Sequence, residues 1–149
     1  MQWTDSGSRK VFSDFIKEGL VHWIPLLSSA CDSFGVQTFD HNAFLGAGAA
    51  GRVFRVQLEN GNEAALKIVS KNIPWLQAEA MALERARNTG VVATVVKSFT
   101  QISNGSGAAI LISPVGKSIL RSSLTEDSLF QIVHSLFILH SAGFQHGDP

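Results

Sequence analysis

The sequence predicts an α+β fold, in which a five-stranded antiparallel sheet with one helix inserted after its third strand is followed by a long helix. Short apolar runs separated by turns rich in glycine and asparagine begin at Asn42 and predict the strands. A stretch rich in Ala, Leu, Glu and Arg follows Pro74, and an apolar stretch with helical spacing follows Thr125. These two stretches predict the helices.

The composition indicates a single globular domain. The chain has 149 residues, 45% of them hydrophobic, which excludes a mostly disordered protein. Its 12 basic and 12 acidic side chains cancel, so it lacks the positive charge by which most nucleic-acid-binding proteins attract phosphates. No apolar stretch approaches the roughly 20 residues that span a bilayer, and the N-terminus lacks the order of a secretory signal. We therefore expect a soluble, intracellular protein without a nucleic-acid or membrane partner.

Residues 1–40 are predicted to form a helical N-terminal extension. Apolar residues recur at helical spacing from Val11 to Asp32, and Pro25 interrupts them. We expect one or two short helices that cover a neighbouring sheet, in preference to a separate binding module. Cys31 is the only cysteine and is predicted to be a small buried residue, with a reactive thiol as the alternative.

Residues 41–116 contain the five predicted strands. A glycine turn that begins at Gly46 separates the first two strands, Asn60-Gly61 forms a hairpin between the second and third, and residues 104–107 join the last two. Asn and Gly tolerate the positive φ values that tight reversals require. The inserted helix runs from Pro74 to Gly90, since Pro fits a first helical turn and Gly ends a helix.

The glycine turn matches a phosphate-binding pattern. Gly46 to Val53 fit G-x-G-x-x-G-x-V, in which glycines let the backbone approach phosphates closely. Dinucleotide-binding folds share this spacing, but their turn opens directly into a helix, whereas residues 52–58 alternate like a strand. The Walker A pattern fails because Arg52 and Val53 stand where its Lys and hydroxyl residue belong. The pattern therefore favours a glycine flap between antiparallel strands.

The third predicted strand carries a lysine in a recognisable setting. Ala64 to Lys67 are close to the V-A-I-K pattern, whose strand lysine contacts the α- and β-phosphates, although a chance lysine at a sheet edge is the alternative. Such a lysine needs a carboxylate to hold it, and the next helix offers Glu79 and Glu84. Glu79 is preferred because Leu83 follows it at i+4, whereas Glu84 lies beside arginines that favour a solvated ion pair.

The end of the chain completes a resemblance. His146-Gly147-Asp148 follows the helix that is predicted from Thr125 to Ser141. The glycine flap, the strand lysine, the helix glutamate and this triplet, in this order, resemble the protein-kinase-like superfamily from Gly46 to Asp148. The resemblance implies a kinase-like small lobe over residues 41–116 and the start of a large lobe over residues 117–149.

The resemblance also implies a reaction and a site. ATP would transfer its γ-phosphoryl group to a hydroxyl, and the family's usual substrates favour a protein Ser or Thr. Lys67 and Glu79 would position the phosphates, and Asp148 would accept the proton of the attacking hydroxyl. Ile112 would flank the adenine, and backbone groups of residues 113–115 would bind its edge. The residues implied to contact ATP are Gly46, Ala47, Gly48, Gly51, Val53, Ala65, Lys67, Ile112 and Val115.

Two departures from the family pattern affect these expectations. Gly147 stands where most protein kinases have Arg, as in divergent small-molecule phosphotransferases, so control through a phosphorylated activation loop is not expected. The residues that bind Mg²⁺, a catalytic-loop Asn and the Asp of D-F-G, would come after Pro149. We therefore expect a truncated chain that holds no metal site and has little activity alone. The alternative is a non-catalytic interaction module derived from the small lobe.

Overall fold

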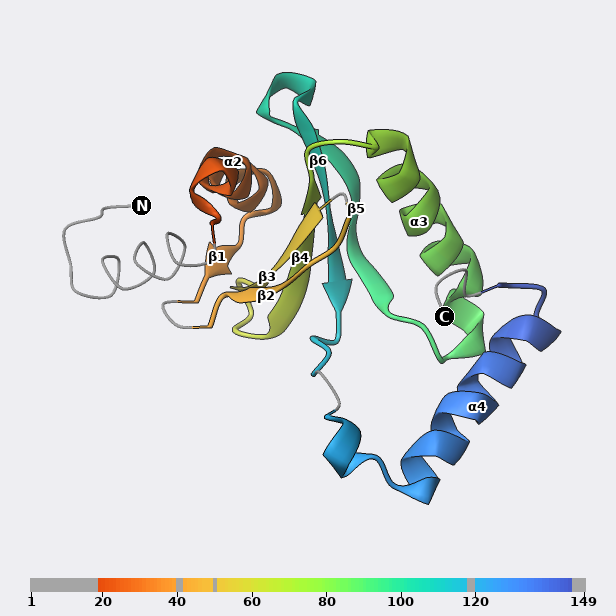
Figure 1. Ribbon diagram of the computed structural model, residues 1–149. Coiled ribbons are helices and arrows are strands. Elements are labelled where there is room, and N and C mark those ends of the chain that lie inside the picture. Colours follow the sequence, from red (N-terminus) through yellow and green to blue (C-terminus); the bar gives the residue numbers. More distant parts are fainter. Residues whose placement is uncertain (1–18, 40–41, 50, 118–119, 146–149) are drawn as a thin grey trace.

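The structure is a computed structural model that describes residues 19–39, 42–49, 51–117 and 120–145 (Figure 1). It contains an antiparallel sheet with helix α2 on one side and helix α3 on the other, and helix α4 lies beyond them. The elements in chain order are η1 (Val21–Trp23), α2 (Ile24–Phe34), β1 (Gln37–Thr38), β2 (Phe44–Ala47), β3 (Gly51–Gln57), β4 (Glu63–Val69), α3 (Ile73–Ala86), η2 (Arg87–Thr89), β5 (Thr94–Ile102), η3 (Ser103–Gly105), β6 (Gly107–Ser113), η4 (Arg121–Ser123) and α4 (Glu126–Ser141).

The sheet has the antiparallel pairing that the turns predict. Its order is β1-β3-β4-β6-β5, and β2 also pairs with β3, so that β4 has a neighbour on both sides. Gly61 has a φ of 82° in the hairpin between β3 and β4, and Asn104 has a φ of 56° between β5 and β6. α3 is inserted after the lysine strand, as predicted. The α+β class and the inserted helix are therefore confirmed.

The predicted number of five strands is wrong, because the described residues form a sheet of six. The additional strand is β1, which pairs with β3 through Gln37↔Gln57 and Thr38↔Val56. It lies inside the segment 1–40 that was predicted to be helical. Gly35 ends α2 with a φ of 66°, and the chain then returns along β3. Two residues are too few to show the alternation by which a strand is recognised.

The N-terminal extension packs against the sheet as expected. Leu20, Trp23, Leu27, Ala30, Phe34 and Val36 share one buried cluster with side chains of β3, β4, β5 and β6. Pro25 does not interrupt a helix, because it lies in the first turn of α2, where its missing N–H has no intrahelical partner to lose. Residues 11–18 of the predicted helical segment lie outside the described residues.

α2 approaches β6 closely at Gly107. A Cβ at Gly107 would lie 2.9 Å from Cδ2 of Leu26 and 2.9 Å from the carbonyl oxygen of Val69. Nearby, the backbone N–H of Ser103 donates a hydrogen bond of 3.0 Å to Oγ of Ser29. The extension is therefore joined to the sheet by packing and by hydrogen bonding.

α3 covers the opposite face of the sheet over a smaller cluster. This cluster holds Val69, Leu76, Ala80, Ala108 and Ile110. Successive side chains of a strand point to opposite faces, so each of β4 and β6 contributes to both clusters. The central strands are buried on the α2 face along their whole length. On the α3 face they are covered only in part.

α4 begins and ends where the sequence predicts. The hydroxyl of Thr125 accepts a hydrogen bond of 3.1 Å from the N–H of Ser128, which caps the helix, and Gly143 follows the helix with a φ of 85°. Neither buried cluster includes a described residue of α4. Its exposed apolar side chains are Leu129, Phe130, Ile132, Val133 and Phe137. Within the described part of the chain, no helix is long and apolar enough to cross a membrane.

Truncating α2 at its interface should destabilise the whole domain. Leu27 is only 4% exposed and lies in the cluster that joins α2 to the sheet. We expect Leu27→Ala to lower the free energy of unfolding by about 2–5 kcal/mol in urea denaturation, the range for a leucine cavity. Ser28→Ala, at an exposed neighbouring position, should change it by less than about 0.5 kcal/mol. Equal midpoints for both variants would show that α2 is not part of the core.

Candidate functional site

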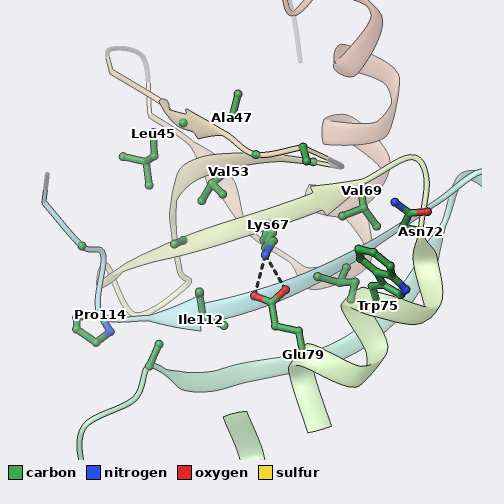
Figure 2. A pocket seen from close by; sticks show the side chains of 18 residues that line it. Leu45, Ala47, Val53, Lys67, Val69, Asn72, Trp75, Glu79, Ile112 and Pro114 are labelled. Atoms are coloured by element: carbon green, nitrogen blue, oxygen red, sulfur yellow. Dashed lines mark hydrogen bonds and ion pairs between the residues drawn. The ribbon is translucent and has the colours of Figure 1, made fainter. Parts of the chain in front are cut away.

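A cavity of about 620 Å³ opens on the face of the sheet that carries α3. Strands β2 and β3 cover it, together with Gly46, Gly48 and Gly51 where the two strands meet, which we call the glycine connection. β4 forms its floor, and α3 and the segment after β6 close it on two sides (Figure 2). The predicted site residues that line it are Gly46, Ala47, Gly48, Gly51, Val53, Ala65, Lys67, Glu79 and Ile112. Val115 does not line it, although Pro114 and Gly116 do. Asp148 lies outside the described residues.

An ion pair between Lys67 and Glu79 lies at the centre of the cavity. Nζ of Lys67 donates hydrogen bonds to both carboxylate oxygens of Glu79, at 2.8 Å to Oε1 and 2.6 Å to Oε2 (Figure 2). Of the two glutamates that the sequence offers, the structure places Glu79 against the lysine. Leu76 and Ala80 are buried against the sheet and turn this side of α3 toward β4. Glu84 is exposed and does not line the cavity.

Folding alone gives little reason for a lysine at this place. Lys67 lies on the central strand β4, between Leu66 and Ile68, which are fully buried. Lysine is seldom placed in such a strand, because its charge must remain solvated or paired. The pair retains side-chain exposures of 30% and 39%, and partly exposed ion pairs contribute only about 0–1 kcal/mol to stability. The arrangement fixes a cation in the cavity without stabilising the fold much.

The glycines of the connection between β2 and β3 have two different roles. A Cβ at Gly51 would lie 2.4 Å from the carbonyl oxygen of Ile68, so only glycine lets β3 pair with β4 there. A Cβ at Gly46 or Gly48 would have nothing within 4 Å beyond its chain neighbours, among the described residues. Close packing therefore explains why residue 51 is a glycine, but it does not explain the glycines at positions 46 and 48. Gly46 and Gly48 leave backbone open to the cavity, where a ligand can approach it.

The chemistry of the cavity changes from the end beside Pro114 to its centre. Val53 and Ile112 lie toward Pro114 and give an apolar lining (Figure 2), to which Ala65 also belongs. Lys67 and Glu79 are the charged side chains among the described lining residues. The cavity can therefore hold a ligand with a flat apolar group at one end and an anionic group near Lys67.

Several lining residues were missed by the sequence reasoning. They are Leu45, Ala49, Val69, Asn72, Trp75, Leu76, Ala93 and Gly116. Two of them follow simple spacing rules that would have found them. Val69 lies two residues after Lys67 and so faces the same side of β4, and Trp75 precedes Glu79 by one helical turn. Trp75 is 74% exposed at the end of the cavity away from Pro114 (Figure 2).

Cys31 lies on α2, away from the cavity, and is half-buried. Burial raises the pKa of its thiol from 9.0 to about 12, and the charge of Asp32 adds to this effect. A thiol is nucleophilic only as the thiolate, so the raised pKa argues against the alternative of a reactive cysteine. The described residues also contain no group of three His, Cys, Asp or Glu side chains that could hold a metal ion.

Comparison with the models of known protein families and with curated proteins found no match to this chain.

The two classes of glycine should respond differently to substitution. We expect Gly51→Ala to lower the free energy of unfolding by about 1–3 kcal/mol, since its Cβ forces β3 away from β4. Gly46→Ala should change it by less than about 0.5 kcal/mol, because its Cβ meets open space. Urea denaturation of both variants measures the difference. A Gly51→Ala variant as stable as the wild type would contradict the close contact at Ile68.

Cys31 should resist alkylation in the folded protein. At pH 8 a rise of the pKa from 9.0 to about 12 lowers the thiolate fraction by roughly 1,000-fold. The group is neutral below its pKa, so the protection should persist until the pH nears 12 or the chain unfolds. Mass spectrometry after timed iodoacetamide treatment, with urea-unfolded protein as the control, measures it. Equal rates in the two states would show that the thiol is accessible and ordinary.

Proposed function

We propose that this chain is the nucleotide-binding part of a protein-kinase-like phosphotransferase. In this proposal it binds ATP in the cavity, and the γ-phosphoryl group is transferred to a hydroxyl of a protein Ser or Thr. The observation that carries the proposal is the ion pair between Lys67 of β4 and Glu79 of α3, beneath the glycine connection.

The charged centre of the cavity suits phosphates. Glu79 fixes the ammonium group of Lys67, which can then donate hydrogen bonds to the α- and β-phosphates without first being ordered. The backbone at Gly46 and Gly48 is open to the cavity and can approach the same phosphates. Phosphoryl transfer depends mainly on such positioning and on charge stabilisation, since the protein supplies little covalent chemistry.

The apolar end suits a nucleobase. Val53 of β3 and Ala65 of β4 both line the cavity, and the small side chain of Ala65 leaves room for a flat ring. Ile112 lies at the edge, on β6. Pro114 has no N–H to offer the base, so backbone donors must come from its neighbours. Val115 keeps its proposed role through its backbone alone, as its side chain does not line the cavity.

The proposed reaction needs a proton acceptor and ligands for Mg²⁺, and the described residues supply neither. Asp148 would accept the proton of the attacking hydroxyl and lies outside the described residues. Mg²⁺ would neutralise charge on the transferring group, and the described residues offer no cluster of carboxylates to hold it. Nucleotide binding, rather than turnover, is therefore the property that the described site can be tested for.

A second function is favoured by one observation. Phe130, Val133 and Phe137 of α4 are more than half exposed, at 72%, 65% and 68%. Contiguous exposed apolar surface often marks a protein interaction site. A non-catalytic interaction module would therefore use α4, and it would form a complex or self-associate without binding nucleotide.

Removing the amine of Lys67 should weaken ATP binding. We expect Lys67→Met to raise the Kd for ATP by about tenfold or more, since hydrogen bonds to a charged group contribute about 1.5–3 kcal/mol. Lys97→Met makes the same chemical change at an exposed position of β5 and should leave the Kd unaltered. Both variants should unfold within about 1 kcal/mol of the wild type. Isothermal titration calorimetry and urea denaturation provide these measurements.

The same experiment can overturn the proposal. A folded wild-type chain that binds no ATP at millimolar concentration would contradict it, as would equal affinities of the two lysine variants. Sedimentation of the same samples addresses the second function. Self-association through α4 without nucleotide binding would favour the interaction module.

A further inference from the structure

Arg52 links the glycine connection to the N-terminal extension. It follows Gly51 on β3, and its side chain lies on the α2 face, opposite to that of Val53 in the cavity. Nη1 donates hydrogen bonds to the carbonyl oxygens of Gly51, at 2.8 Å, and Gly48, at 3.4 Å. The guanidinium carbon lies 5.0 Å from the centre of the Trp23 ring, within the range of a cation–π contact.

Trp23 is held firmly in the core. It is 4% exposed, belongs to the cluster between α2 and the sheet, and its backbone N–H donates to the carbonyl of Leu20 at 2.8 Å. Its indole Nε1 is buried without a hydrogen-bond partner among the described residues. A smaller apolar side chain at this place would bury no unpaired N–H. What tryptophan adds is the ring face that the guanidinium of Arg52 covers.

β2 pairs with β3 as far as Ala47↔Arg52, and beyond this pair the described residues of the glycine connection have few contacts. A Cβ at Gly46 or Gly48 would meet no side chain or backbone of the described residues within 4 Å, and glycine loses more conformational freedom on ordering than any other residue. One backbone hydrogen bond of 3.1 Å, from the N–H of Gly48 to the carbonyl of Gly51, closes the turn. Arg52 binds a carbonyl at each end of this turn.

We propose that Trp23 and Arg52 are positioning residues, through which the N-terminal extension holds the glycine connection ready to receive the phosphates of a nucleotide. The planar guanidinium is needed for both contacts, because it stacks on the ring while its N–H groups reach the carbonyls. Pre-ordering the connection reduces the entropy lost on binding. The inference rests on the proposed function for the identity of the ligand, whereas the ordering itself concerns the free protein.

Two readouts test the inference in the full chain. The first is hydrogen exchange of the backbone amides between residues 43 and 52 without ligand. Arg52→Lys and Trp23→Leu should speed it about two- to fivefold, the range for a cation–π contact at a partly exposed site. The second is the Kd for ATP and for adenosine. Both variants should raise the Kd for ATP by a similar factor. They should leave the Kd for adenosine unchanged, since adenosine lacks the phosphates.

Two further variants separate positioning from general stability. Trp23→Phe keeps an aromatic face, so its hydrogen-exchange rates and its Kd for ATP should stay close to those of the wild type. Ser29→Ala removes the hydrogen bond between α2 and Ser103, which does not involve the connection, and should alter neither. If Trp23→Leu does not fold, Arg52→Lys tests the inference by itself. It replaces a half-buried side chain and creates no cavity in the core.

The outcomes distinguish this inference from the proposed function. Unchanged exchange in Arg52→Lys, or an equal loss of affinity for ATP and adenosine, would overturn the inference. A wild-type chain that binds neither ligand would overturn the proposed function, and the exchange rates would then still decide whether Arg52 and Trp23 order the connection.

Discussion

The packing of α2 against one face of the sheet determines which side chains are free to form a site on the other. It buries β3, β4 and β6 on the α2 side, so alternate residues of these strands must face the other way. On β4 those residues are Ala65, Lys67 and Val69, which form the floor of the cavity. A segment outside the predicted small lobe thus supplies the core that leaves the opposite face free for binding.

The proposed site combines a rigid floor with a cover that has little packing of its own. Lys67 lies on the central strand, and buried residues of α3 direct Glu79 toward it, so the ion pair is set by the core. Within the described part of the chain, the glycine connection has no comparable support from side-chain packing, apart from Gly51 against β4. If Arg52 orders the connection as we propose, contacts from the α2 face compensate for this. One layer of packing then influences both the floor and the cover of the cavity.

Local sequence signals predict most of the fold and part of the site. Asn60-Gly61, Pro74 and the cap at Thr125 act within a few residues, so the hairpin and the helix ends follow from them. β1 and the contact between Trp23 and Arg52 depend on pairings between distant segments, which no local pattern reveals. The choice of Glu79 over Glu84 lies between these cases, because the buried positions of α3 fix which side of the helix faces Lys67.

Nucleotide binding in the cavity can be tested by asking which lysine lies beside the phosphates of a bound nucleotide. An ATP derivative with an acyl group on its γ-phosphate transfers that group to a nearby amine, and mass spectrometry then identifies the modified lysine. We predict acylation of Lys67 that excess ATP prevents. Equal, unprotected acylation of the exposed Lys71, Lys97 and Lys117, with none at Lys67, would contradict the proposed site.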